Sequence, residues 1–297
     1  MKSFPSRFKT VACLSVMLAL GGCASTAVST APAAGAPAAK AANTTGPSGS
    51  GVNNALLHAV AWKQTAAEYR ALYYQGFNVA RMHVEAAIAK RKPGDKPLAV
   101  VTDMDDTVLH ALNYWGHLVN KNLDYFDDPI WDAWIPQNKV TASPGASEFL
   151  KFCADNNVEV YYITSREQGE KTYEYALGHL KHLGFPYADT KHLTVLRDTS
   201  NKEKRQDEVM KDYNVVVFLG DNLNDFRRKY YLKNDVDGRI KMMEGDRDKY
   251  VRNYIVFPNP TDGHWLAAIF GDSEPPPTDA NREIMKKAAT KSAWSVN

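Results

Sequence analysis

Five short apolar segments between residues 98 and 257 constrain the fold of this chain most strongly. They cover residues 98–102, 158–163, 193–196, 215–219 and 254–257, and they are rich in β-branched and aromatic residues. Their apolar residues do not alternate with polar ones, which is typical of strands buried on both faces of a parallel sheet. Helical patterns at residues 146–156, 169–183 and 202–213 separate them. We therefore predict an α/β fold with a doubly wound, mainly parallel sheet.

A long helical pattern precedes the first of these segments. Between residues 53 and 92, apolar and aromatic residues recur at intervals of three and four, and no proline interrupts them. Tyr69, Tyr73 and Phe77 belong to this series. The pattern predicts one helix, and its aromatic side chains are expected to pack in the core rather than to bind a ligand.

The first 22 residues have the pattern of a signal peptide. Lys2, Arg7 and Lys9 precede an apolar run at residues 11–20, which is about half the length that a membrane-spanning helix needs. Small residues then lead to Cys23, and this arrangement resembles a bacterial lipobox, in which the cysteine is lipidated. The alternative is an ordinary signal peptide with an unrelated cysteine.

The segment after Cys23 has the composition of a flexible tether. Of residues 24–52, 25 are Ala, Pro, Gly, Ser or Thr, so the segment has little to bury. We therefore expect an exported domain that a lipid holds in the cell envelope. Because no aspartate follows Cys23, we expect the outer membrane.

Composition and charge exclude several classes of protein. With 44% apolar and 24% charged residues, the chain is neither wholly disordered nor a polytopic membrane protein. Without the three basic residues of the first 22, 33 basic residues remain against 34 acidic ones. This balance gives no reason to expect a nucleic-acid polymer as partner. Cys153 is the one cysteine after the tether, so the folded part holds no internal disulfide.

Polar residues follow four of the predicted strands, at the point where each strand ends. They are Asp103 and Asp105 after the first strand, Thr164 and Ser165 after the second, Lys202 after the third, and Asp221 and Asp225 after the fourth. Ligands of open α/β sheets bind outside the carboxyl ends of the strands. We therefore expect these side chains, which lie up to 122 positions apart, to meet in one crevice.

Several carboxylates in one crevice repel each other unless a cation lies among them. Oxygen ligands without histidine or cysteine suit a hard ion such as Mg²⁺, which leaves coordination positions open for a phosphate group. One aspartate could then attack phosphorus, and a second, two residues further on, could act as general acid and base. Crowding among the carboxylates is expected to raise the pKa of Asp105, whereas the metal would lower it.

Two motifs identify a family that the chain resembles. Residues 101–109 read Val-Thr-Asp-Met-Asp-Asp-Thr-Val-Leu, and residues 220–226 read Gly-Asp-Asn-Leu-Asn-Asp-Phe. Both are similar to motifs of the bacterial class C acid phosphatases, which are lipoproteins of the haloacid dehalogenase-like (HAD) superfamily. The likeness extends over residues 53–265 and includes Trp131, Trp134 and the segment Pro258-Asn259-Pro260.

The resemblance implies a role for each site residue. These roles are nucleophile and metal ligand for Asp103, general acid/base and carbonyl ligand for Asp105, metal binding for Asp221 and Asp225, phosphate binding for Thr164, Ser165 and Lys202, and substrate pocket for Tyr114 and Trp131. It further implies Mg²⁺ as cofactor and a smaller helical cap domain over the site. Known members hydrolyse small phosphomonoesters, often 5′-nucleotides, at acidic pH, and some form homodimers.

The resemblance also divides the chain. We expect a signal peptide at 1–22, a lipid-anchored flexible linker at 23–52, an acid phosphatase domain with its helical cap at 53–270 and a C-terminal tail at 271–297.

Three positions depart from the family pattern. Asp106 stands where the family usually has glutamate, and Ala111 stands where it has asparagine or threonine. Asp262 stands where the family commonly has a tyrosine that sandwiches the substrate's ring. An aspartate cannot stack on a base, and its charge would repel a second phosphate. A preference for nucleotides is therefore less firmly implied than phosphatase chemistry.

Other interpretations remain open at this stage. The same residues could serve a phosphotransferase or a phosphatase of non-nucleotide esters, and a silent surface binding lipoprotein could share the fold. His179 and His182 could form a metal pair, but a solvated helix face is the simpler interpretation. His110 could reach the pocket or be packed in the core.

Overall fold

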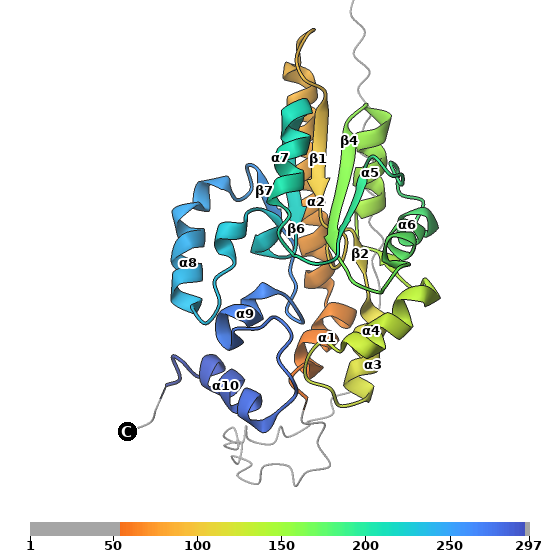
Figure 1. Ribbon diagram of the computed structural model, residues 1–297. Coiled ribbons are helices and arrows are strands. Elements are labelled where there is room, and N and C mark those ends of the chain that lie inside the picture. Colours follow the sequence, from red (N-terminus) through yellow and green to blue (C-terminus); the bar gives the residue numbers. More distant parts are fainter. Residues whose placement is uncertain (1–53, 295–297) are drawn as a thin grey trace, which may run out of the picture. The chain divides into compact units, whose positions relative to one another are not determined.

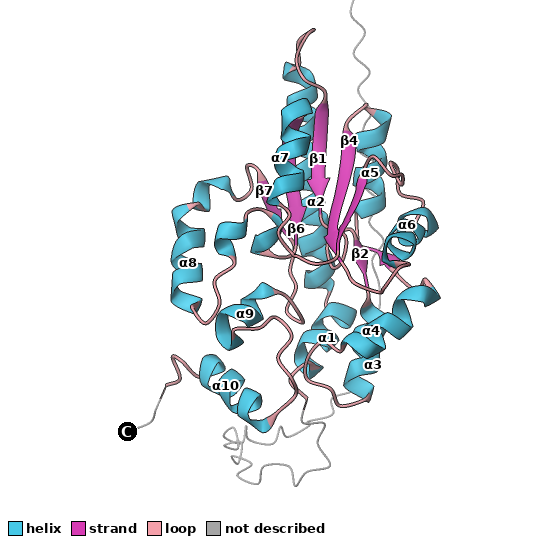
Figure 2. Cartoon of the chain, viewed as in Figure 1, coloured by secondary structure: helices cyan, strands magenta, loops and turns pink. Residues whose placement is uncertain are grey.

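The described residues, 54–294 of this computed structural model, build one five-stranded sheet in which every neighbouring pair is parallel. Its strands are β1 (Leu98–Thr102), β4 (Glu159–Ser165), β5 (Leu193–Leu196), β6 (Asn214–Gly220) and β7 (Tyr254–Val256). Their order, β5-β4-β1-β6-β7, places the first strand in the middle and adds later strands outward on both sides. The doubly wound parallel sheet is confirmed, and Figure 2 shows its strands running in one direction.

Both faces of the sheet are covered. On β1, Val100 faces a core shared with α2 (Ala67–Lys90), α5 (Ala146–Asp155) and α6 (Thr172–His182). The neighbouring Ala99 and Val101 face a second core with Val209 of α7 (Glu203–Asp212). Figure 1 shows α7 in front of the sheet and α2 behind it. Because helices exclude water from both faces of the sheet, the strand side chains that point to either face must be apolar. This explains why the apolar runs are not interrupted by polar residues.

The predicted helix at residues 53–92 is two helices in the structure. α1 (Leu57–Thr65) and α2 are separated at Ala66, whose ψ of 124° is extended rather than helical. The prediction of one continuous helix is therefore wrong. Tyr69, Tyr73 and Phe77 are all buried in the core on α2, as predicted, and Cys153 is buried on α5.

Helices gather beyond the carboxyl ends of the strands and form the predicted cap (Figure 1). They are α1, α3 (Leu112–Asn120), α4 (Asp128–Trp134), the 3₁₀ turn η1 (Ile135–Gln137), α9 (His264–Phe270) and α10 (Asp279–Ala289). Two short strands, β2 (Leu109–His110) and β3 (Thr141–Ala142), pair antiparallel. They lie directly before α3 and after η1, so they join the two ends of this segment. The cap thus combines helices from both ends of the described chain with the insertion after β1.

The remaining elements lie between β6 and β7. The 3₁₀ turns η2 (Leu223–Asp225), η3 (Arg228–Tyr230) and η4 (Arg247–Lys249) flank α8 (Val236–Gly245). The segment expected as a tail contains α10, and Arg282 on this helix pairs with the buried Asp124 at 2.7 Å.

The signal peptide, Cys23 and the linker lie outside the described residues. Among the helices of residues 54–294, none is long and apolar enough to cross a membrane.

A buried ion pair fastens the cap to the sheet. Lys63 of α1 is fully buried, lies 2.8 Å from Asp106 in the loop after β1, and donates a hydrogen bond of 2.9 Å to Thr261 after β7. Removing one partner of a buried pair leaves the other charge uncompensated, which is far more costly than removing an exposed one.

We predict that Lys63→Met lowers the free energy of unfolding by about 3–5 kcal/mol, because Asp106 stays buried without its cation. Urea denaturation measures this change. Lys151→Met is the matched control, since Lys151 pairs with Asp155 in the open, and its loss should stay within about 1 kcal/mol. Equal losses in the two variants would contradict the role of the buried pair.

Candidate active site

The end of β1 delivers two of the predicted aspartates. Asp103 continues the sheet, because its backbone N–H donates to the carbonyl of Leu219 on β6 at 2.9 Å. The chain then turns sharply, with the N–H groups of residues 107–109 all pointing to the carbonyl of Met104. This turn separates the side chains of Asp103 and Asp105, which line the same cavity but contact different partners.

The end of β6 delivers the other two. Asp225 is folded back by a capping box in which its carboxylate accepts a hydrogen bond of 2.9 Å from the N–H of Asn222. Gly220 is required for this approach, since a Cβ there would lie 2.4 Å from the Cβ of Asp225. Asp221 accepts hydrogen bonds from Asn259 at 2.8 Å and from Thr107 at 3.3 Å.

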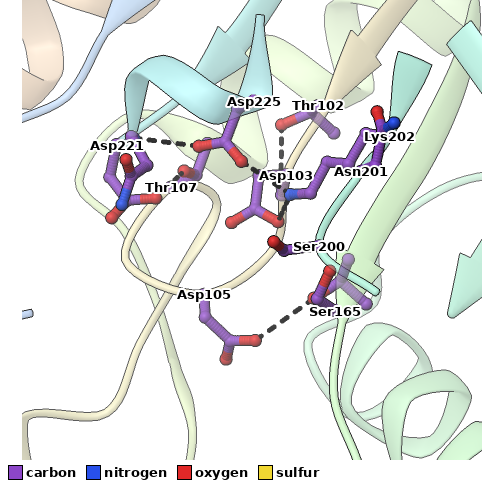
Figure 3. Close-up of polar contacts among 12 residues, drawn as sticks. Thr102, Asp103, Asp105, Thr107, Ser165, Ser200, Asn201, Lys202, Asp221 and Asp225 are labelled. Atoms are coloured by element: carbon purple, nitrogen blue, oxygen red, sulfur yellow. Dashed lines mark hydrogen bonds and ion pairs between the residues drawn. The ribbon is translucent and has the colours of Figure 1, made fainter. Parts of the chain in front are cut away.

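Three carboxylates meet where β1 and β6 end. Asp103, Asp221 and Asp225 each offer an oxygen atom, and these atoms lie within 4.8 Å of one another. Lys202, at the start of α7, contacts Asp103 and lies 2.7 Å from Asp225 (Figure 3). The predicted convergence of residues far apart in the sequence is therefore what the fold produces.

The charges of this cluster suit the binding of a cation. Burial raises the pKa of Asp103 to about 7; Lys202 opposes this rise, and Asp225 adds to it. Burial, together with the charges of Asp225 and Asp103, raises the pKa of Asp221 well above its ordinary value. Among the described residues one lysine, Lys202, pairs with this cluster, and its single charge does not balance three carboxylates, of which Asp103 and Asp225 are buried and Asp221 is half-buried. The donors are all carboxylate oxygens, so the site fits a hard divalent cation.

Asp105 points away from this cluster and pairs with Arg166. The two carboxylate oxygens accept hydrogen bonds of 2.7 and 2.6 Å from Nε and Nη2 of the guanidinium. Although burial opposes ionisation, Arg166 holds the pKa of Asp105 below its ordinary value. The expectation that crowding raises this pKa is therefore wrong, because an arginine, and not another carboxylate, contacts Asp105.

His179 holds Arg166 in place. Its Nδ1 accepts a hydrogen bond of 3.0 Å from Nη1 of Arg166, and its Nε2–H donates to the carbonyl of Ile135 at 3.0 Å. His179 is buried, so a solvated helix face is wrong for this residue, whereas His182 is exposed. The sequence analysis gave Arg166 no role and considered His179 only as half of a possible metal pair. The position of Arg166 directly after Ser165 was the available signal.

The predicted phosphate-binding residues line one cavity of about 290 Å³, together with the four aspartates. Thr164 donates from Oγ1 to Asp105 at 3.4 Å, and Ser165 donates to the carbonyl of Thr199 at 3.2 Å. Lys202 lines the same cavity, and Figure 3 shows Lys202 and Ser165 on the same side of Asp103, so hydroxyl donors and a cation lie beside the carboxylate of Asp103.

A smaller cavity of about 140 Å³ adjoins the first and shares Asp105 with it. Trp131 lines this cavity, as the resemblance implies. Tyr114 lines neither of the two cavities, so its predicted place in the substrate pocket is wrong. Tyr114 is fully buried, and the centre of its ring lies 4.9 Å from that of the Trp131 ring. Its hydroxyl donates to the carbonyl of Asp127 and accepts from the N–H of the same residue. His110 is also buried and bonds to Tyr69.

Comparison with known proteins agrees with this arrangement. The family model described as HAD superfamily, subfamily IIIB (acid phosphatase) matches residues 24–265. Two solved structures of the class C acid phosphatase from Bacillus anthracis, one with tungstate bound, share 31% sequence identity with this chain. Each superposes with a TM-score of 0.71 and covers 81% of this chain and 97% of its own. The chain therefore belongs to the subfamily IIIB acid phosphatases of the HAD superfamily and is a phosphomonoesterase.

Proposed function

We propose that the enzyme is a Mg²⁺-dependent acid phosphatase that hydrolyses phosphomonoesters through an aspartyl phosphate on Asp103. The observation that supports this most is the cluster of Asp103, Asp221 and Asp225 beside Lys202, whose oxygen atoms lie within 4.8 Å of one another. The related enzyme with bound tungstate adds support, because tungstate is a tetrahedral oxyanion like phosphate.

In this mechanism Asp103 and Asp105 divide the chemistry. A carboxylate oxygen of Asp103 attacks phosphorus, the P–O bond to the alcohol breaks, and Asp105 gives its proton to the leaving oxygen. Water then attacks the aspartyl phosphate and Asp105 takes a proton from it, which releases phosphate and restores both residues. Because Arg166 favours the ionised form of Asp105, the first step needs a proton that an acidic medium supplies.

The other residues position and neutralise the phosphate. Lys202 and the hydroxyls of Thr164 and Ser165 face the space where the phosphoryl oxygens would lie. Asp103, Asp221 and Asp225 would hold the metal, with the backbone carbonyl of Asp105 as a further ligand. Mg²⁺ supplies Lewis-acid charge to the phosphoryl group when it is bound.

Two alternatives concern which phosphomonoester is hydrolysed and whether water or an alcohol accepts the phosphoryl group. The resemblance favours 5′-nucleotides, and the same residues would also transfer the phosphoryl group to an added alcohol. A silent binding protein is disfavoured because nucleophile and acid/base are both present. A homodimer remains a prediction that the described residues do not test.

We predict that Asp103→Asn lowers kcat on an aryl phosphate by on the order of 10⁴-fold or more, because an amide cannot form the covalent intermediate. Asp105→Asn should cost about 10²–10⁴-fold through loss of proton transfer. Steady-state release of the aryl alcohol measures both. Asp248→Asn, an exposed position, is the control and should keep full activity. An active Asp103→Asn enzyme would refute the assigned nucleophile.

Removal of the metal provides a separate test. Exhaustive chelation should abolish turnover and added Mg²⁺ should restore it, because the three clustered carboxylates otherwise lack balancing charge. Asp221→Asn should raise the Mg²⁺ concentration for half-maximal activity by about 10–100-fold or more. Turnover that persists without any divalent ion would contradict the metal requirement.

We further propose that the enzyme is exported and anchored in the outer membrane by a lipid on Cys23. The charged start, the short apolar run and the small residues before the cysteine support this.

We predict that Cys23→Ala moves the enzyme from the membrane fraction to the soluble fraction of the cell envelope, because a lipid is the proposed attachment. Immunoblotting of separated fractions, with metabolic labelling by a fatty acid, measures the change. Cys153→Ala is the matched control and should stay in the membrane fraction. Unlabelled wild-type protein would contradict the anchor.

A further inference from the structure

A chain of hydrogen bonds connects the cap with the carboxylate of Asp105. The backbone carbonyl of Ile135, in the cap turn η1, accepts a hydrogen bond of 3.0 Å from Nε2–H of His179 on α6. Nδ1 of His179 accepts one of 3.0 Å from Nη1 of Arg166, whose Nε and Nη2 donate to the two oxygens of Asp105 at 2.7 and 2.6 Å. His179 and Arg166 are both buried. The proposed acid/base is thus joined to the cap through two side chains that water does not reach.

The two partners of His179 determine its protonation state. An arginine N–H can only donate and a carbonyl oxygen can only accept, so Nδ1 carries the lone pair and Nε2 carries the proton. Burial, together with the charge of Arg166, lowers the pKa of His179 to about 4. An imidazolium would direct a second donor against Nη1 of Arg166. His179 is therefore a neutral imidazole that offers Arg166 a hydrogen-bond acceptor.

The bond to His179 fixes the orientation of the guanidinium of Arg166. A guanidinium is planar and rigid, so a partner that holds Nη1 also determines where Nε and Nη2 lie. Within residues 54–294, Arg166 is the one basic side chain that forms an ion pair with Asp105. The other bond to this carboxylate, from Thr164, is longer at 3.4 Å. The direction in which the Asp105 carboxylate points therefore depends on Arg166, and through it on His179.

This direction matters for the proposed chemistry. Asp105 must lie within hydrogen-bond reach of the leaving oxygen in order to give it a proton. A misplacement of about 1 Å can cost on the order of 10²-fold in rate. The side chain of Asp105 is 26% exposed, so the cavity leaves it room to turn if Arg166 moves. A residue that restricts this movement affects proton transfer without touching the substrate.

We propose that His179 is a positioning residue for the reaction, which acts through Arg166 to hold the Asp105 carboxylate where it can protonate the leaving oxygen. The bond to Ile135 keeps the imidazole turned so that its lone pair faces Arg166. This inference rests on the proposed acid/base role of Asp105 and names the side chain that orients it.

The test compares two substrates whose leaving oxygens need a proton to different degrees. Nitrophenolate is a stable anion and can leave 4-nitrophenyl phosphate without a proton, whereas the alcohol of glycerol 2-phosphate leaves as a poor alkoxide unless it is protonated. Because kcat/KM covers the steps up to the departure of this group, hydrolysis of the aspartyl phosphate does not enter it. The readout is kcat/KM for the nitrophenyl ester divided by kcat/KM for the alkyl ester, measured with the Mg²⁺-loaded enzyme. Impaired proton transfer raises this ratio.

Two substitutions each keep one of the two bonds of His179. In His179→Gln the amide reaches the position of Nε2 and can donate to Ile135, but Nη1 of Arg166 loses its acceptor. In His179→Asn the amide oxygen takes the position of Nδ1 and can accept from Arg166. We expect His179→Gln to raise the ratio about 10–100-fold and His179→Asn to raise it at most about threefold. His182→Gln, on the same helix but exposed, is the matched control and should keep the wild-type ratio.

A double substitution tests whether His179 acts through Asp105. Asp105→Asn alone should raise the ratio about 10²–10⁴-fold. Adding His179→Gln to it should change the ratio by less than about twofold, because no carboxylate is left to position. Each ratio is measured within one preparation, so an unfolded fraction cancels. Equal losses of kcat/KM on both esters in His179→Gln are what a purely structural role predicts and would overturn the inference.

The design separates this inference from the function on which it rests. If Asp105→Asn raises the ratio but His179→Gln does not, Asp105 is the acid/base and His179 does not position it. If Asp105→Asn itself leaves the ratio unchanged, the proposed acid/base role fails, and the inference fails with it.

Discussion

Repulsion among three clustered carboxylates is the constraint on which this molecule depends. Asp103, Asp221 and Asp225 offer oxygens within 4.8 Å of one another, and within residues 54–294 Lys202 is the one basic side chain that forms an ion pair with any of them. Such a cluster is unfavourable by itself. A divalent cation would balance the negative charge of the three carboxylates. The cation and Lys202 together would then attract a dianionic phosphate group. The parallel sheet makes this possible because it brings the ends of β1 and β6 side by side.

Much of this arrangement could be predicted because it follows from periodicity and topology. The unbroken apolar runs indicated strands buried on two faces, and the structure places β1 and β5 at the predicted residues. A parallel sheet with strands added outward from β1 places every strand's carboxyl end at the same edge. Asp103 and Asp221 therefore had to approach each other, although 118 positions separate them in the sequence.

The errors arose where a side chain's partner depends on three-dimensional packing. Ala66 breaks the first helix without a proline or glycine to signal it. Arg166 follows the predicted Thr164 and Ser165, yet nothing in the sequence indicates that it pairs with Asp105 and rests on His179. Tyr114 carries the residue type of a pocket wall but lies behind Trp131. Tertiary contacts of this kind leave no periodic pattern in the sequence.

The most direct test of the account is to locate the metal. In crystals soaked with Mn²⁺ as a Mg²⁺ analogue, anomalous diffraction should show an ion about 2.0–2.2 Å from carboxylate oxygens of both Asp103 and Asp221. This would establish that residues from two strands share one ion beside the nucleophile. An active enzyme whose Mn²⁺ lies elsewhere, with no ion between these two aspartates, would contradict the central claim.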